Sequence, residues 1–153
     1  MNQLNNKQKL KLLNLLIMEN RLRMPDKMRP FLEPKRHKFA YGGRGGGKSE
    51  TIAKILLYLG NTSKLKILCT REFQNSIKES VHSLLSELIS KLNYTNYVIT
   101  NNGIENIYTK TRFIFMGLQQ QDKKQTLKSL SNCDICWCEE APRLASSLAS
   151  SSV

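Results

Sequence analysis

The sequence has no hydrophobic run long enough to cross a membrane. None of its stretches reaches the roughly 18 apolar residues that a membrane-spanning helix needs. Residues 10–18 are apolar, but Lys11 and Asn14 interrupt them and no small-residue cleavage site follows. We therefore expect neither a membrane segment nor a secretory signal, and we expect the chain to stay in the cytoplasm.

Cysteine is scarce, and three of the four cysteines lie close together in the sequence. In the cytoplasm they are expected to remain reduced thiols. On a strand, Cys136 and Cys138 would face one side and Cys133 the other, which disfavours a zinc site built from all three. The pattern instead predicts that these three and Cys69 are buried as small hydrophobic residues.

Acidic residues are half as common as basic ones. The chain has 12 Asp and Glu against 24 Lys and Arg, a net charge of +12. Residues 1–48 hold twelve basic and three acidic residues, a net +9, which leaves +3 for the remainder. This excess favours a polyanionic partner, either nucleic acid or an anionic membrane surface; the alternative is a solvated face that keeps the protein soluble.

Glycine is concentrated in one segment of the sequence, residues 42–47. Residues 42–49 fit the phosphate-binding pattern Gly-x-x-x-x-Gly-Lys-Ser. Glycines allow backbone N–H groups to wrap around phosphate oxygens. The candidate nucleotide-binding residues are therefore Gly42, Gly43, Arg44, Gly45, Gly46, Gly47, Lys48 and Ser49.

The two residues that end this pattern predict the ligands, ATP and Mg²⁺. Lys48 would reach the β- and γ-phosphates, and the Ser49 hydroxyl would bind Mg²⁺. We predict a strand at residues 38–41 before the loop and a helix at 51–59 after it, ended by Gly60 and Asn61. The alternative is a flexible glycine linker. A nucleotide motif beside the basic segment favours nucleic acid as the polyanion.

The N-terminal segment is predicted to be a helix followed by a connector. Residues 7–19 show helical periodicity with a basic start, and residues 20–34 form an irregular basic stretch broken by three prolines. The predicted elements after the loop are a strand at 65–70, a helix at 75–92 and strands at 97–100, 105–109 and 112–116.

The strand at 65–70 is continuously apolar, as in the middle of a parallel sheet, and the three later strands indicate an antiparallel extension. Arg71 follows the first strand, where it would face nucleotide or DNA, or form a surface salt bridge with Glu72. Residues 119–130 are polar and basic, and suit either a DNA-backbone contact or a solvated loop.

Residues 135–138 form a short apolar strand that ends in two adjacent carboxylates, Glu139 and Glu140. This is the form of a Walker B element, in which the first acid holds the Mg²⁺ shell and the second polarises the attacking water. Paired acids alone are more often a charged turn, but these lie about 90 residues after a phosphate loop. Trp137 and Cys138 are predicted to be packing residues.

Taken in order, these blocks resemble the large terminase subunit of tailed bacteriophages, of prophage type, over about residues 32–141. The resemblance rests on residues 38–49, 68–71, 76–81, 113–118 and 134–141. It implies an α/β P-loop NTPase fold, RecA-like, of the additional-strand, catalytic-glutamate class. Such a fold has a mostly parallel sheet with flanking helices, and here it would be incomplete at the C-terminus.

The resemblance also implies roles. Lys48 and Ser49 would bind phosphate and Mg²⁺, Glu139 would be the Walker B acid and Glu140 the catalytic glutamate. Arg44 would sense or stabilise the γ-phosphate, unless it only attracts phosphate in general. The implied partners are double-stranded DNA, the terminase small subunit, the portal and procapsid, and other copies of the chain in an intact motor. The setting would be a bacterial host cell.

The sequence departs from the family after Ala141, where the coupling motif and the nuclease domain of longer members have no counterpart. We therefore predict a basic helix and connector at residues 1–34, a partial ATPase domain at 35–142 and a low-complexity tail at 143–153. We expect weak ATP binding, poor hydrolysis and no nuclease activity, as for a fragment from a decayed prophage or a frameshifted gene. The alternatives are another P-loop ATPase acting on nucleic acid, or an inactive remnant that binds DNA or a partner.

Overall fold

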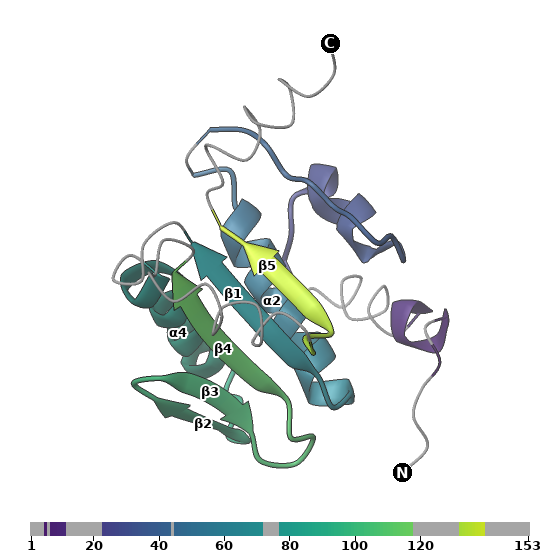
Figure 1. Ribbon diagram of the computed structural model, residues 1–153. Coiled ribbons are helices and arrows are strands. Elements are labelled where there is room, and N and C mark those ends of the chain that lie inside the picture. The colour runs from purple at the N-terminus through teal and green to yellow at the C-terminus, as the bar shows by residue number, and fades with distance from the viewer. Residues whose placement is uncertain are drawn as a thin grey trace.

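The part of the chain that the structure describes forms a five-stranded sheet, with the two longest described helices on the same face of it (Figure 1). The computed structural model describes residues 5, 7–11, 23–43, 45–71, 77–117 and 132–139. The strands are β1 Lys66–Arg71, β2 Tyr97–Thr100, β3 Gly103–Asn106, β4 Arg112–Gly117 and β5 Ile135–Cys138. The helical elements are η1 Asp26–Leu32, α2 Lys48–Thr62, η2 Lys78–His82 and α4 Ser83–Lys91.

The strand order is β2-β3-β4-β1-β5. β1 lies between β4 and β5 and pairs with both in parallel. β3 pairs with β4 in the antiparallel sense, and β2 pairs with β3 in the same way, which extends the sheet beyond β4. The predictions of a central parallel strand and of an antiparallel extension are therefore both confirmed. The fold class is mixed α/β.

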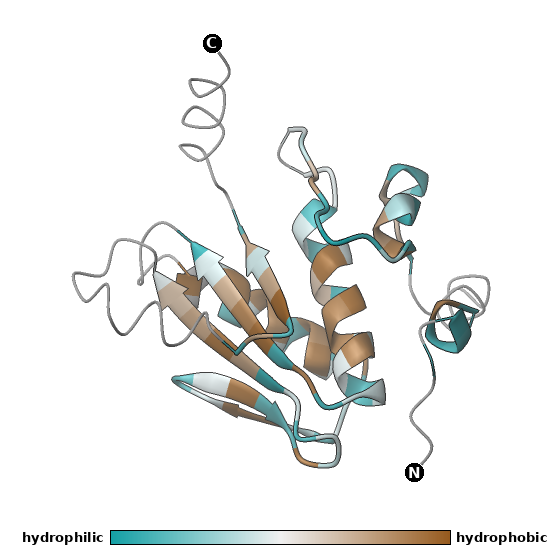
Figure 2. Cartoon of the chain, turned by 45° about the vertical axis from the view of Figure 1, so that its right-hand side comes forward, coloured by the Kyte–Doolittle hydropathy of each residue, from teal (hydrophilic) through white to brown (hydrophobic). Residues whose placement is uncertain are grey.

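The core lies between the sheet and the two helices. Because side chains alternate along a strand, two cross-strand rows face α2 and α4. These rows are Phe113, Ile67 and Ile135, and Phe115, Cys69 and Trp137. The buried helical residues that pack against them include Ala53, Leu56, Leu57, Leu85 and Leu88. Figure 2 shows apolar residues along the strands and along the adjoining helices.

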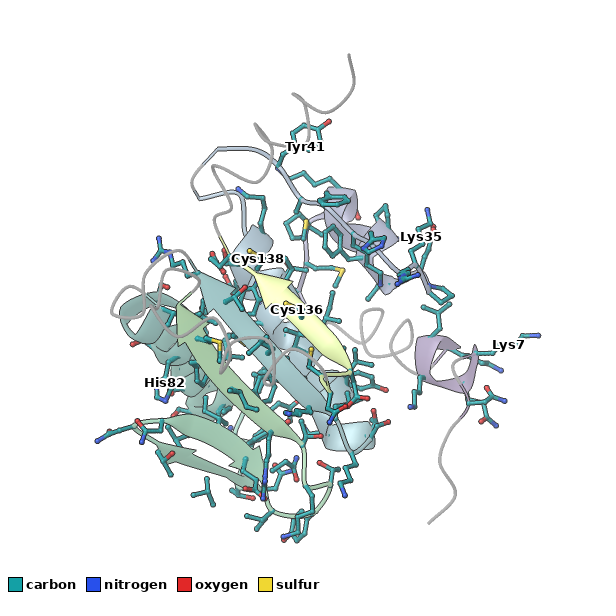
Figure 3. The ribbon with its side chains drawn as sticks, in the orientation of Figure 1. Lys7, Lys35, Tyr41, His82, Cys136 and Cys138 are labelled. Carbon is teal, nitrogen blue, oxygen red and sulfur yellow. The ribbon has the colours of Figure 1, made fainter. Side chains whose placement is uncertain are left out.

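Of the four cysteines, only Cys69 is fully buried as predicted, and burial raises the pKa of its thiol, so it stays neutral. Cys133 is half-buried, whereas Cys136 and Cys138 are exposed. The prediction of buried cysteines is thus wrong for these two, and so is the packing role given to Cys138. They alternate with Trp137, which faces the helices, and therefore lie on the opposite face of β5 (Figure 3).

The predicted strand at residues 38–41 is not present. These residues pair with none of the described strands, and the side chains of Phe39 and Tyr41 are 83% and 97% exposed. Figure 3 shows Tyr41 standing away from the sheet. An apolar, β-prone segment becomes a strand only when a neighbouring backbone accepts and donates its hydrogen bonds.

The upstream connector contains more structure than predicted. From Arg23 onward it includes η1, a 3-10 helix with Pro30 inside it and with Met28 buried. Proline excludes an α-helix interior here, but this short 3-10 segment accommodates it while Met28 packs inward. The predicted N-terminal helix is described only at residues 7–11, where Asn5 and Gln8 cap each other's backbone N–H groups.

Several predicted boundaries shift. α2 continues past Gly60 to Thr62, and the helix predicted at 75–92 is a π-helical turn, η2, followed by α4. β3 ends at Asn106 because its side-chain oxygen accepts hydrogen bonds from the N–H groups of Tyr108 and Thr109, which forms a turn. No helix in the described part of the chain is long and apolar enough to span a membrane. The domain boundaries at residues 34 and 142 stay predictions.

Candidate nucleotide-binding site

The glycine-rich loop leads directly into α2. Gly45 and Gly47 have φ angles of +76° and +69°, in the left-handed region that favours glycine. Gly47 is the N-cap of α2, and its carbonyl accepts the N–H of Thr51 at 3.0 Å. The helix predicted after the loop is confirmed. Its first turn has backbone N–H groups and a partial positive charge at the loop, which together suit an anion.

Lys48 folds over the loop that precedes it. Its Nζ donates hydrogen bonds to the carbonyl oxygens of Gly42 at 2.9 Å and Gly43 at 2.6 Å. An ammonium has three donor hydrogens, so these two bonds leave one. The loop backbone therefore holds the positive charge of Lys48 at the N-terminal end of α2.

Ser49 and Glu139 meet across 90 residues of sequence. The Ser49 hydroxyl donates to Oε1 of Glu139 at 2.5 Å. Glu139 directly follows β5, and its backbone N–H donates to the carbonyl of Thr70 at 2.9 Å, which extends the pairing of β5 with β1. The parallel sheet thus positions this carboxylate at the first turn of α2.

Oxygen Oε2 of the same carboxylate is buried and has no hydrogen-bond partner among the described residues. An unpaired buried carboxylate oxygen is costly, and such atoms usually mark a missing water, ion or ligand. Mg²⁺ prefers hard oxygen ligands and keeps several waters, so the Ser49 hydroxyl and the Glu139 carboxylate are suitable donors. The residues present therefore fit a magnesium ion.

These groups gather at the carboxyl edge of the parallel strands. Figure 1 shows the chain entering α2 beyond the ends of β1 and β5. Arg71 is the last residue of β1 and is in register with Gly117 at the end of β4. In open α/β sheets this edge is where ligands bind. Arg71 was predicted just after the strand and is instead its last residue, at the same edge of the sheet, and its role stays a prediction.

Both predicted catalytic residues, Arg44 and Glu140, lie outside the described residues, as do Glu72 and residues 119–130. The structure brings together the described glycines of the loop with Lys48, Ser49 and Glu139.

Sequence reasoning missed two upstream neighbours of the loop. A Cβ atom built on Gly47 would lie 3.4 Å from Cγ of Pro25, and one on Gly46 would lie 3.7 Å from Nζ of Lys27. No motif or spacing marks either contact, and the general basic excess of residues 1–48 was the only signal available.

Comparison with known protein families gives a match that includes this site. A family model described as phage terminase large subunit matches residues 34–148. The matched span includes the glycine loop and both glutamates, and it begins after Lys27. A search of curated proteins found no match.

Proposed function

The chain belongs to the phage terminase large subunit family, and from this membership we propose that it contains the ATP-binding and ATP-hydrolysing site of a DNA-packaging motor. The observation that carries the proposal is the hydrogen bond between Ser49 and Glu139, which joins the end of the phosphate-loop pattern to the predicted Walker B acid. We assign the fold to the RecA-like, additional-strand class of P-loop NTPases. The parallel order β4-β1-β5, with the loop at its carboxyl edge, supports this.

The phosphate groups of ATP would lie against the loop and the first turn of α2. The left-handed glycines allow the loop to present its backbone N–H groups, and Lys48 supplies a full positive charge. Ser49 and Glu139 would hold Mg²⁺, which neutralises charge on the phosphates when it is bound. In this arrangement Glu139 also orients the Ser49 hydroxyl.

We assign hydrolysis to Glu140 and Arg44, on their sequence positions and family membership. Glu140 is the next residue in the sequence after Glu139, whose backbone N–H donates to the carbonyl of Thr70. It would accept the proton of the attacking water as general base. Arg44, inside the loop, would stabilise the negative charge that develops on the transferred phosphoryl group.

The family also supplies the proposed partners: double-stranded DNA, a small terminase subunit, a portal and procapsid, and further copies of the chain. The net charge of +9 on residues 1–48 supports the DNA contact, because basic side chains bind phosphates through displacement of counterions.

Nucleotide binding is tested by thermal melting of the full chain with and without MgATP. A ligand that binds only the folded state at about 100 times its dissociation constant stabilises that state by about 2.7 kcal/mol. We expect MgATP to raise the melting temperature of the parent and not of Lys48→Ala, whereas Lys35→Ala responds like the parent. Lys35 is an exposed lysine paired with Glu33, and so controls for loss of charge. A cooperative melt that MgATP does not shift would contradict the proposal.

Hydrolysis is tested by phosphate release with and without double-stranded DNA. We expect DNA to stimulate release by the parent, and Glu140→Gln to abolish release while MgATP still raises its melting temperature. Release that persists in Glu140→Gln would remove Glu140 from the mechanism.

A further inference from the structure

A segment upstream of the loop is held against α2. Nζ of Lys54, on the second turn of α2, donates to the carbonyl of Arg23 at 3.2 Å. Pro25 lies beside Gly47, with its Cγ 3.4 Å from a Cβ position there, and Met28 is buried, with 3% of its surface exposed. These two contacts and the buried Met28 flank Lys27 in the sequence and hold its backbone next to the loop.

Lys27 places a second ammonium group beside Lys48. The Nζ atoms of both lysines are 3.7 Å from the same point, the Cβ position of Gly46. The two nitrogens are therefore separated by no more than twice that distance. Like charges at this separation repel one another, and a bound anion between them converts the repulsion into two attractions.

Neighbouring basic residues differ from Lys27 in having carboxylate partners. Arg29 pairs with Asp26 at 2.9 Å, and Lys35 pairs with Glu33 at 3.0 Å. In the part of the chain that the structure describes, no carboxylate pairs with Lys27. Its ammonium lies beside the loop, and none of the described carboxylates neutralises it.

We propose that Lys27 is a second phosphate-binding residue of this site, which reaches the loop from η1 and contacts the polyphosphate of the nucleotide together with Lys48. The inference rests on the proposed function, since it needs nucleotide in the loop. An ammonium is a point-charge donor to phosphate oxygens, and two such donors beside the loop would hold a polyphosphate more tightly than one. The contact would also couple the position of η1 to nucleotide binding.

The test is the dissociation constant of MgATP for the full chain, measured by calorimetry, in the parent, Lys27→Met, Lys27→Arg and Arg29→Met. Loss of one charge-assisted hydrogen bond is expected to weaken MgATP binding about ten-fold in Lys27→Met. Lys27→Arg keeps the charge and should retain most of the affinity. Arg29→Met removes the same charge from the same segment and should bind as the parent does. AMP, which lacks the β- and γ-phosphates, should bind the parent and Lys27→Met equally.

These measurements distinguish a failure of the Lys27 proposal from a failure of the proposed function. Parent-like MgATP affinity in Lys27→Met, with loss of binding in Lys48→Ala, would overturn the role of Lys27 and leave the proposed function intact. Equal weakening by Lys27→Met and Arg29→Met would also overturn it, because only the general positive field would then matter. If the parent binds no nucleotide, both proposals fail. An unchanged melting temperature of unliganded Lys27→Met confirms that the variant is folded.

Discussion

The polar groups at the two ends of α2 differ in whether they have hydrogen-bond partners. At the C-terminal end, neighbouring side chains satisfy the helix carbonyls: Tyr97 Oη donates to Leu57 at 2.9 Å, Thr109 Oγ1 to Gly60 at 2.6 Å and Thr111 Oγ1 to Ser63 at 2.5 Å. At the N-terminal end, among the described residues, Lys48 bonds to the carbonyls of its own loop, and one buried oxygen of Glu139 has no partner.

The difference separates a structural end from a binding end. Every helix leaves unsatisfied backbone groups at both termini. The β2–β4 region fills those at the C-terminal end, and the fit is close, because a Cβ on Gly60 would lie 2.8 Å from Tyr97 Oη. At the N-terminal end, the backbone N–H groups, Lys48 and Glu139 lie at the edge of the sheet, where a bound ligand would supply their remaining partners. Substitutions at the two ends should therefore change different measured quantities.

The largest expected effect is at the N-terminal end. Glu139→Gln should weaken MgATP binding about 10- to 100-fold, because the residue that orients a metal ligand loses its charge. The unliganded protein should be as stable as the parent or more so, since a buried, unpaired carboxylate oxygen is removed.

This outcome is measured by calorimetry with MgATP and by urea unfolding without it. If the variant loses stability but binds MgATP like the parent, Glu139 is a structural residue and the N-terminal end of α2 is not the binding end.

A smaller effect, on stability alone, is expected at the C-terminal end. Thr111 is fully buried, and its hydroxyl donates to the carbonyl of Ser63 and accepts the N–H of Leu65 at 3.0 Å. Thr111→Val keeps the shape but leaves both backbone groups unpaired, which should lower the free energy of unfolding by about 2 kcal/mol.

The measurement is urea unfolding, and the control is the MgATP dissociation constant of the folded variant, which should not change. A marked loss of nucleotide affinity in Thr111→Val would show that the two ends of α2 are coupled.

The smallest effect concerns Glu50, in the first turn of α2. A hydrogen bond from Lys54, with an N–O distance of 2.7 Å, lowers the pKa of the Glu50 carboxyl below its usual 4.5. A lowered folded-state pKa means that the pair stabilises the protein above the unfolded pKa and that this stability is lost as the pH falls through the folded pKa. Because the Glu50 side chain is 45% exposed, solvent screens the pair.

Glu50→Gln should therefore cost about 0.3–0.5 kcal/mol of unfolding free energy at neutral pH and almost nothing well below pH 4.5. Urea unfolding at the two pH values measures the difference, with Glu87→Gln, an exposed residue of α4, as the matched control. A cost for Glu50→Gln that persists in acid would rule out the ion pair as its cause.

Local pattern predicted much of the fold correctly. The glycine run followed by Lys48 and Ser49 predicted a loop entering a helix, and α2 begins at that lysine. The apolar run before Glu139 predicted the strand that became β5. These elements depend on residues adjacent in the chain, so their spacing is sufficient to identify them.

Elsewhere the same reasoning failed because the outcome depended on a neighbour. Phe39 and Tyr41 have strand-forming side chains but no paired backbone in the described chain. Cys138 was expected to pack, and it lies on the exposed face of β5. The connector is rich in proline, yet it contains the 3-10 helix η1, whose Met28 side chain is buried in the fold.

The sequence by itself determined the chemical groups of the site: the glycines that accept positive φ, the ammonium of Lys48, the hydroxyl of Ser49 and the carboxylate of Glu139. Only the tertiary structure decided that Ser49 and Glu139 meet, and that Lys27 lies beside Lys48. Backbone propensity acts over a few neighbouring residues, whereas these contacts require β5 to pair with β1 and η1 to dock on α2, which burial and hydrogen bonding across the whole fold determine.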